Sequence, residues 1–164
     1  PVNIFALSEC PMQSALWLDD IRKNKMILES AQMLSTAVRW LDPDTTLPVY
    51  KLAYINHPCS KWARASRANF KWLLSHMSWL YNQKSGEHKS ARLIPTFQQY
   101  VEHGYFPREE LTGFANCARN LERGVDYSHV DDVQKAYRMY MNDRWKERTI
   151  TLTWNWGEEP EWRL

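Results

Sequence analysis

The segment from Met26 to Val38 constrains the fold of this chain more than any other. Its residues are apolar or small and uncharged, except that Gln32 is polar and Glu29 carries the only charge. A helix that is apolar nearly all round lies in the protein interior. The segment therefore predicts a helix through the core, with one carboxylate inside the protein or at the floor of a cleft.

Start and stop signals place this helix and its neighbours along the chain. Pro11 sits where a helix often starts, and Asp19-Asp20 puts negative charge at the start of the helix that contains Glu29. We expect that helix to run to about Leu41 and to stop before Asp42-Pro43. Apolar side chains at helical spacing predict a second long helix from Pro58 to near Gly86.

The second half of the chain has weaker signals. Residues 93–103 predict a shorter helix with Gly104 as its cap, 111–121 fit a helix, and Asp131-Asp132 caps a last long helix that runs to about Trp145. Residues 150–156 alternate strictly between apolar and polar, which indicates an extended segment. The expected fold class is all-α, a compact single-domain helical bundle over residues 1–164 with a short extended, aromatic-rich C-terminal segment.

Composition narrows the class of protein. The three cysteines are widely spaced without a C-x-x-C motif, so neither a disulfide framework nor a zinc ribbon is expected. A zinc site that includes His57 and Cys59 is the less favoured alternative to no metal at all. We find no signal peptide and no membrane-spanning stretch, so we expect a protein of the cytoplasm that does not bind membranes.

Glu29 has two interpretations. A buried carboxylate must be protonated, paired with a base, or directed at a polar cavity. A structural ion pair with a core Arg, Lys or His is the default for an isolated buried glutamate. A catalytic role requires a second reactive group close to it.

The first residue offers such a group. A chain that begins at Pro1 is consistent with removal of an initiator Met, which would leave a secondary amine that is partly neutral and nucleophilic at neutral pH. Together with a carboxylate, this amine could attack C1′ of a sugar and form an iminium ion. The alternative is a solvated terminus with no chemical role.

Two histidines stand at the ends of the second long helix. His57 precedes Pro58 at its start, where a neutral imidazole is favoured, and His88 follows Gly86. Both are candidates for proton transfer. As an alternative, histidines at helix ends often act as caps or are exposed.

Basic residues gather between Pro58 and Arg92, where Glu87 is the only acidic residue. Such clustering is expected of a face that contacts a phosphate backbone, and it is also typical of a solvated helix face. The formal net charge of +2 does not decide between them. The basic residues are Lys61, Arg64, Arg67, Lys71, Lys84, Lys89 and Arg92.

Several of these patches, in this order, resemble the pyrimidine-dimer DNA glycosylases of phage endonuclease V type and their bacterial relatives. They are the N-terminal segment, Asp20 with Glu29 nine residues on, His57-Pro58 before a long helix, and Gly86-x-His88-x-Ser90. The resemblance covers patches within residues 1–93. Beyond them, only the aromatic C-terminal segment with Trp154 and Trp156 is similar in character.

The resemblance implies a DNA glycosylase with associated AP-lyase activity that needs no cofactor. The amine of Pro1 would attack C1′, and Glu29 would assist sugar opening and the proton removal that drives β-elimination. It further implies a monomer that binds double-stranded DNA, in an infected host cell if the protein is phage-encoded. The residues expected to bind DNA are Arg22, Lys25, Lys61, Arg64, Lys71, Lys89, Arg92, Trp154 and Trp156.

Four positions depart from the family pattern. The family enzyme begins with Thr where this chain has Pro1, and Arg22 replaces a histidine. Leu28 and Gln32 replace the arginines that grip DNA beside the glutamate. These changes leave open which damaged or modified base is recognised. The alternative function is a non-catalytic, phage-type DNA-binding protein that retains the scaffold. A third hypothesis is a helical interaction protein with no role in nucleic-acid binding.

Overall fold

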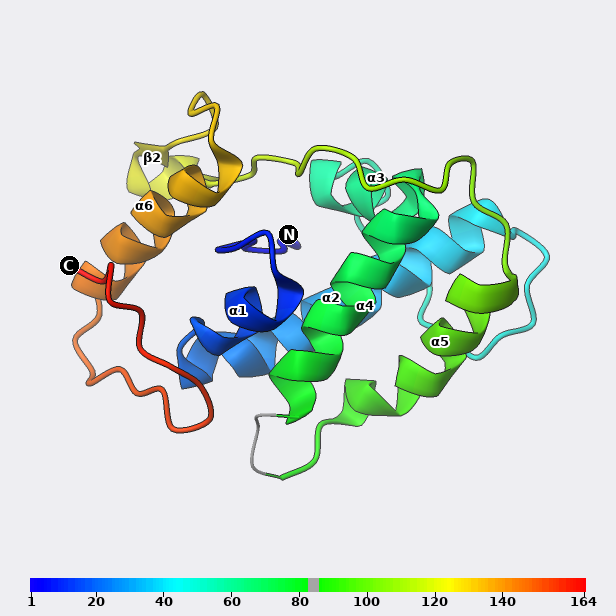
Figure 1. The fold of residues 1–164 in the computed structure, drawn as a ribbon, viewed down its shortest axis with the longest axis horizontal. Helices are drawn as coiled ribbons and strands as arrows, with labels where there is room; N and C mark the ends of the chain where they lie inside the picture. Colours follow the sequence, from blue (N-terminus) through cyan, green and yellow to red (C-terminus); the bar gives the residue numbers. More distant parts are fainter. Residues whose placement is uncertain (83–85) are drawn as a thin grey trace.

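A computed structural model of the chain describes residues 1–82 and 86–164. Within them the protein is all-α: its helices surround a core, and its only sheet is a pair of two-residue strands in which Arg119 pairs with Asp126 (Figure 1). The α-helices are α1 (Pro11–Leu16), α2 (Asp20–Leu41), α3 (Pro58–Ala65), α4 (Arg67–Asn82), α5 (Ile94–His103) and α6 (Val133–Lys146). The 3₁₀ helices are η1 (Lys89–Leu93) and η2 (Leu121–Arg123), and the strands are β1 (Arg119–Asn120) and β2 (Val125–Asp126).

Helix α2 confirms the predicted core helix. Asp19 caps it by accepting the backbone N–H of Arg22, and the helix ends one residue before Asp42. Met26, Ile27 and most of the apolar residues after them are buried, against α3 and α4 in particular. No helix among the described residues is both long and apolar enough to cross a membrane.

The second long helix was predicted as continuous, and this prediction was wrong. Ser66 takes an extended conformation and separates α3 from α4. Its hydroxyl accepts the backbone N–H of Asn69, and its carbonyl accepts the N–H of Phe70. Ser66 thus caps the start of α4, a role in which serine is favoured over its place inside a helix. Lys84, near the predicted end of this helix, lies outside the described residues, and Gly86 is not helical.

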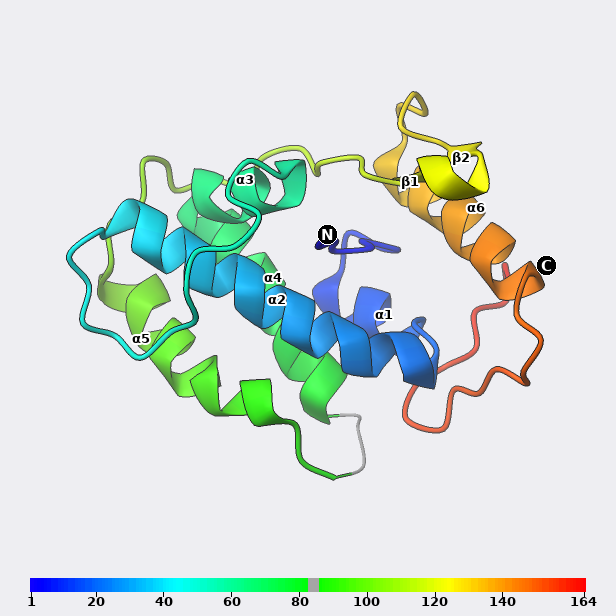
Figure 2. The same ribbon diagram turned by 180° about the vertical axis from the view of Figure 1, so that it is seen from behind.

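The N-terminal segment, residues 1–7, runs between two groups of helices. Both views place it between α6 on one side and α2, α3 and α4 on the other (Figures 1 and 2). Val2, Ile4, Phe5, Ala6 and Leu7 are all buried. The core is therefore built in part around a piece of chain that has no regular secondary structure.

The helix predicted over residues 111–121 is also wrong. Residues 104–118 form a long irregular connection that crosses from α5 past α3 to β1 (Figure 1). Its backbone is held by distant side chains: Asn69 accepts the N–H of Thr112, and the hydroxyl of Tyr137 accepts the N–H of Cys117. Since these amide groups bond to α4 and α6, they are not available for helical hydrogen bonds.

Two of the remaining predictions agree with the structure. Asp132 caps α6, and Gly104 is the C-cap of α5, where an added Cβ would meet the ring of Tyr100 at 2.5 Å. The segment predicted to be extended over residues 150–156 agrees only in part, because residues 151–154 have no regular secondary structure and residues 155–156 lie in a turn. Thr153 accepts the backbone N–H of Asp20, which fixes this segment beside the start of α2.

The cap at Ser66 gives a first prediction. Changing Ser66→Ala should lower the free energy of unfolding by about 1 kcal/mol, because the N–H of Asn69 loses its acceptor in a buried place. Chemical denaturation measures this change. Ser78→Ala is the matched control, since Ser78 lies inside α4 and its hydroxyl donates to the carbonyl of Leu74 within the same helix. Equal effects of the two substitutions would refute the capping role.

Candidate functional site

A cavity of about 650 Å³ opens beside the N-terminal segment. It lies where this segment, the first half of α2, the start of α3, residues 117–122 and α6 come together. Aromatic rings, two glutamates and several cationic groups share its wall. The polar, charged and aromatic residues on it, with the terminal Pro1, are Pro1, Asn3, Phe5, Arg22, Lys25, Glu29, His57, Cys117, Arg119, Asn120, Glu122, Tyr140 and Arg144.

Glu29 lies in this cavity and is half-buried. Its Oε1 accepts the backbone N–H of Asn3 at 2.9 Å. Burial raises the pKa of Glu29 to about 7, even though Arg22, the Asn3 N–H, the N-terminal charge and Lys25 each act to lower it. Desolvation of the carboxylate therefore outweighs four favourable interactions, and Glu29 exchanges its proton near neutral pH.

Pro1 lines the same cavity and is exposed. Its positive charge acts on both Glu29 and His57, lowering the pKa of each. No ion pair between Pro1 and Glu29 is present in the described part of the chain, so the amine faces the cavity without being neutralised by this carboxylate. The two groups predicted to form the site thus share one cavity, although the predicted basic helix contributes only its first residue, Pro58, to the wall.

His57 is the third predicted catalytic residue that the cavity contains. It is the N-cap of α3, and its Nδ1 accepts the N–H of Cys59 at 3.1 Å. Burial lowers the pKa of His57, and the charges of the N-terminus and Arg119 lower it further. The neutral ring therefore carries its proton on Nε2 and can act as a donor.

His88 was predicted to be catalytic and lies elsewhere. Its Nδ1 accepts the N–H of Ser90, and its Nε2 lies 3.1 Å from the carbonyl of Asn24. Both ring nitrogens thus contact backbone groups, and His88 joins η1 to α2. It is not among the residues that line the cavity.

Four cationic side chains surround the cavity: Arg22, Lys25, Arg119 and Arg144. Within residues 1–82 and 86–164, none of the four side chains makes an ion pair or a hydrogen bond. The Nε atoms of Arg22 and Arg144 are buried without a hydrogen-bond partner. Only Glu29 and Glu122 provide negative charge on the wall.

Arg22 is the least accessible of these cations, at 9% exposed. Its guanidinium lies 5.3 Å from the centre of the Phe5 ring. Burial lowers the pKa of Arg22, and the like charge of Arg144 adds to this effect. Unpaired guanidinium groups held near each other form a binding place for an anion, because bidentate contacts to phosphate would satisfy both.

Sequence reasoning identified Arg22 and Lys25 but missed Arg119 and Arg144. Arg144 lies on the last helix, and Arg119 lies in the segment whose structure was predicted wrongly. No local spacing connects either residue with Glu29. The only available signal was their charge, which many exposed arginines share.

The residues of the predicted basic face do not all have the same role. Lys61, Lys71, Lys89 and Arg92 are exposed and do not line the cavity. Arg64 is only 8% exposed: its guanidinium donates to the carbonyl of Ile55 and lies 4.4 Å from the centre of the Trp40 ring. The geometry makes Arg64 a structural residue that holds the chain before α3.

The two tryptophans expected to contact DNA also lie away from the cavity. The indole N–H of Trp154 donates to the carbonyl of Trp17, and its ring packs edge-on against Trp145. Trp154 therefore holds the C-terminal segment on the core. Trp156 is 38% exposed, so part of its side chain remains accessible for stacking with a partner.

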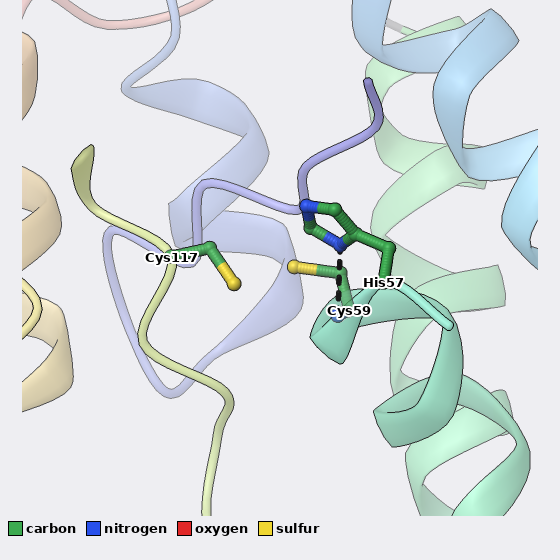
Figure 3. Close-up of side chains that lie close together, drawn as sticks. All are labelled: His57, Cys59 and Cys117. Atoms are coloured by element: carbon green, nitrogen blue, oxygen red, sulfur yellow. Dashed lines mark hydrogen bonds between the residues drawn. The ribbon is translucent and has the colours of Figure 1, made fainter. Parts of the chain in front are cut away.

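His57, Cys59 and Cys117 form a cluster whose ligand atoms lie within 4.8 Å of one another (Figure 3). The imidazole is a poor metal ligand as it stands. Its Nδ1 lone pair accepts the N–H of Cys59, which leaves the proton on Nε2. A zinc ion at this position would have to break the cap of α3, so the thiol pair is the more significant part of the cluster.

The raised pKa of Glu29 predicts a pH-dependent contribution to stability. The folded protein holds this proton up to about pH 7, whereas the ordinary value is 4.5. Because the folded state binds more protons than the unfolded state between these values, the carboxyl group lowers stability as the pH rises through that window. Glu29→Gln keeps an acceptor for Asn3 and removes the titration.

The free energy of unfolding of Glu29→Gln, relative to that of the wild type, should therefore increase as the pH rises from 4.5 to 7. At pH 8 the difference should be about 1–3 kcal/mol. Urea denaturation at pH 4.5, 6 and 8 measures the difference. Glu122→Gln, an exposed glutamate on the same cavity, is the matched control. A gain that is equal at pH 4.5 and pH 8 would rule out the protonated state of Glu29.

Comparison of the chain with protein-family models, with curated proteins and with solved structures finds no match. The comparisons therefore neither support nor oppose the resemblance to pyrimidine-dimer DNA glycosylases, which rests on the sequence patches alone. The chemistry of the cavity is the remaining basis for a proposed function.

Proposed function

We propose that this protein is a DNA base-excision enzyme, a glycosylase with associated AP-lyase activity that acts on a damaged or modified base. One observation carries the proposal: the amine of Pro1 and the carboxyl group of Glu29 share a cavity with four unpaired cationic side chains. A nucleophile, a proton-transfer group and phosphate-binding groups are the parts that this chemistry requires.

In the proposed first step, the secondary amine of Pro1 attacks C1′ of the nucleotide and the bond from C1′ to the base breaks. The base leaves with the bonding electron pair and takes up the proton that the amine nitrogen loses. The protonated carboxyl group of Glu29 then donates to the ring oxygen O4′ as the nitrogen lone pair opens the sugar. The product is an iminium ion on C1′. Pro1 would perform this role where residue 1 is the mature terminus of the protein.

In the second step, the carboxylate of Glu29 removes a proton from C2′. The resulting enamine expels the 3′ phosphate, which breaks the strand, and water then releases Pro1 from the product. Glu29 acts first as acid and then as base, for which a pKa of about 7 is suited. The Asn3 N–H holds the carboxyl group in place through both steps.

The cationic wall supports binding of the substrate. The cavity has the size of a typical small-molecule pocket, which suits a single nucleotide turned out of the duplex. Arg22 and Arg144 would contact phosphate groups beside that nucleotide, and Phe5 and Tyr140 offer aromatic surface to the base. The Nε2–H group of His57 could donate a hydrogen bond to the departing base.

A covalent-trapping experiment tests the nucleophile. Incubation with an abasic duplex and borohydride should give one protein–DNA adduct, and peptide mass spectrometry should place it on residue 1 of a protein whose intact mass confirms Pro1 as the terminus. A Gly-Ser extension before Pro1 should remove the adduct from Pro1, because the ring nitrogen becomes an amide, and any residual adduct should then lie on the new terminal glycine. Binding without any adduct would instead favour the non-catalytic DNA-binding alternative.

Glu29 is tested separately on the same duplex. Glu29→Gln should still form the adduct, since an abasic aldehyde reacts with an amine unaided. Strand cleavage should fall by about 100-fold or more, because no base removes the C2′ proton. Unchanged cleavage by Glu29→Gln would remove Glu29 from the mechanism. Glu122→Gln is again the control and should cleave normally.

Binding to DNA tests the cationic wall. Arg144→Ala should weaken affinity for an abasic duplex about tenfold or more and lower the slope of log affinity against log salt by about 1. Lys51→Ala, an exposed lysine away from the cavity, should change neither. Lys71→Ala compares the exposed basic face: if it weakens binding more than Arg144→Ala does, DNA lies on that face and not at the cavity.

A further inference from the structure

Cys59 and Cys117 form a pair of thiols at the wall of the cavity. Cys59 lies in the first turn of α3 and is fully buried, while Cys117 lies in the irregular connection two residues before β1 and is 8% exposed. Their sulfur atoms lie within 4.8 Å of each other, and the close-up shows both pointing into the same space (Figure 3). Segments far apart in the sequence thus bring two reduced cysteines together.

The two thiols differ in access and in acidity. Only Cys117 lines the cavity, so a small oxidant can reach it. The neighbouring Cys59 thiol lowers the pKa of Cys117, and the positive charge of Arg119 contributes to this effect. The proximity of Cys117, together with burial, raises the pKa of Cys59. Cys117 is the more reactive sulfur, and Cys59 is held behind it in the protonated form.

We propose that Cys117 and Cys59 are a peroxide-reactive pair that closes a reversible disulfide between α3 and the connection before β1. This inference does not depend on the proposed DNA chemistry. Cys117 corresponds to the attacking thiol of such pairs and Cys59 to the resolving thiol.

The electron balance involves hydrogen peroxide as the oxidant. The Cys117 thiolate attacks one oxygen of the peroxide, the O–O bond breaks, and the second oxygen leaves as hydroxide and takes up a proton as water. Cys117 is then a sulfenic acid. The sulfur of Cys59 attacks the Cys117 sulfur, and the hydroxyl group leaves as a second water with the Cys59 proton. The two thiols have together lost two electrons to the peroxide. Two molecules of a small thiol reduce the disulfide back to the two cysteines by thiol–disulfide exchange.

The pair is connected to Glu29 through one residue. The Asn3 side chain donates to the carbonyl of Cys117 at 3.0 Å, and its Oδ1 lies 3.9 Å from the Cys59 sulfur. The backbone N–H of the same residue holds Glu29. Closing the disulfide draws the Cys117 segment toward α3 and shifts the position of Asn3. Oxidation would thus change the wall of the cavity on which Glu29 and Pro1 lie.

Thiol trapping on the full chain tests the pair. The protein is treated with hydrogen peroxide, blocked with an alkylating reagent and digested without reductant. We expect a peptide that links Cys59 to Cys117, with alkyl groups only on the exposed Cys10. The melting temperature should rise by about 5 °C, because a disulfide across a long loop restricts the unfolded chain. A reducing thiol should restore both changes.

Single substitutions separate the two roles. Cys59→Ser should leave a sulfenic acid on Cys117 that dimedone traps, whereas Cys117→Ser should leave Cys59 reduced, and neither should show the rise in melting temperature. Cys10→Ser is the matched control and should form the disulfide as the wild type does.

Two results would overturn the proposal. One is full alkylation of Cys59 and Cys117 after peroxide in a folded wild type. The other is one equivalent of zinc in the purified protein, with both thiols reacting only after a chelator removes it, because the cluster would then be a metal site that breaks the cap of α3. Either result leaves the trapping experiment on Pro1 unaffected, so the two proposals fail separately.

Discussion

Helix α6 packs on the buried N-terminal segment, and this contact creates the cavity. Phe5 stacks on Tyr140 and meets the edge of Tyr137, and Arg138 donates to the carbonyl of Leu7. Phe5 has a φ of 50°, a conformation that a bulky residue rarely adopts. The Asn3 side chain supports it by accepting the N–H groups of both Ile4 and Phe5. Because the segment runs between α2 and α6, its first residue ends at the cavity and not at a distant surface.

The same residue, Asn3, explains how structure and chemistry are coupled. Its side chain shapes the turn at Phe5 and contacts the thiol pair, and its N–H positions Glu29. Because its backbone N–H and both polar atoms of its side chain are engaged in this way, Asn3 fixes the carboxyl group relative to the terminus. The geometry of Pro1 and Glu29 is therefore set by the fold of the N-terminal segment itself.

The sequence predicts those parts of the fold that have local causes. The caps at Asp19 and Asp132 and the apolar run after Met26 lie within one or two helical turns of the elements that they define. Ser66 was missed because a capping serine was hidden in a continuous helical pattern. Residues 111–121 could not be predicted, since Asn69 and Tyr137 hold their backbone from far along the chain. The same distinction holds for the residues of the site. Glu29 could be predicted because it is the only charge in an apolar segment, whereas only the tertiary structure brings Arg144 and Cys117 to the cavity.

The charge balance of the cavity favours a protein that is completed by an anionic ligand. Arg22 is buried beside Arg144 without a partner, which costs free energy in the unliganded protein. A bound phosphate group would neutralise these guanidinium groups. It would also weaken two of the influences that lower the pKa of Glu29, namely the charges of Arg22 and Lys25. Under the proposed function, binding of DNA would thus raise the pKa of Glu29 further and keep it protonated until the sugar opens. The unpaired cations and the poorly solvated glutamate would then act together, because the negative charge of the ligand would keep Glu29 in its protonated, acidic form.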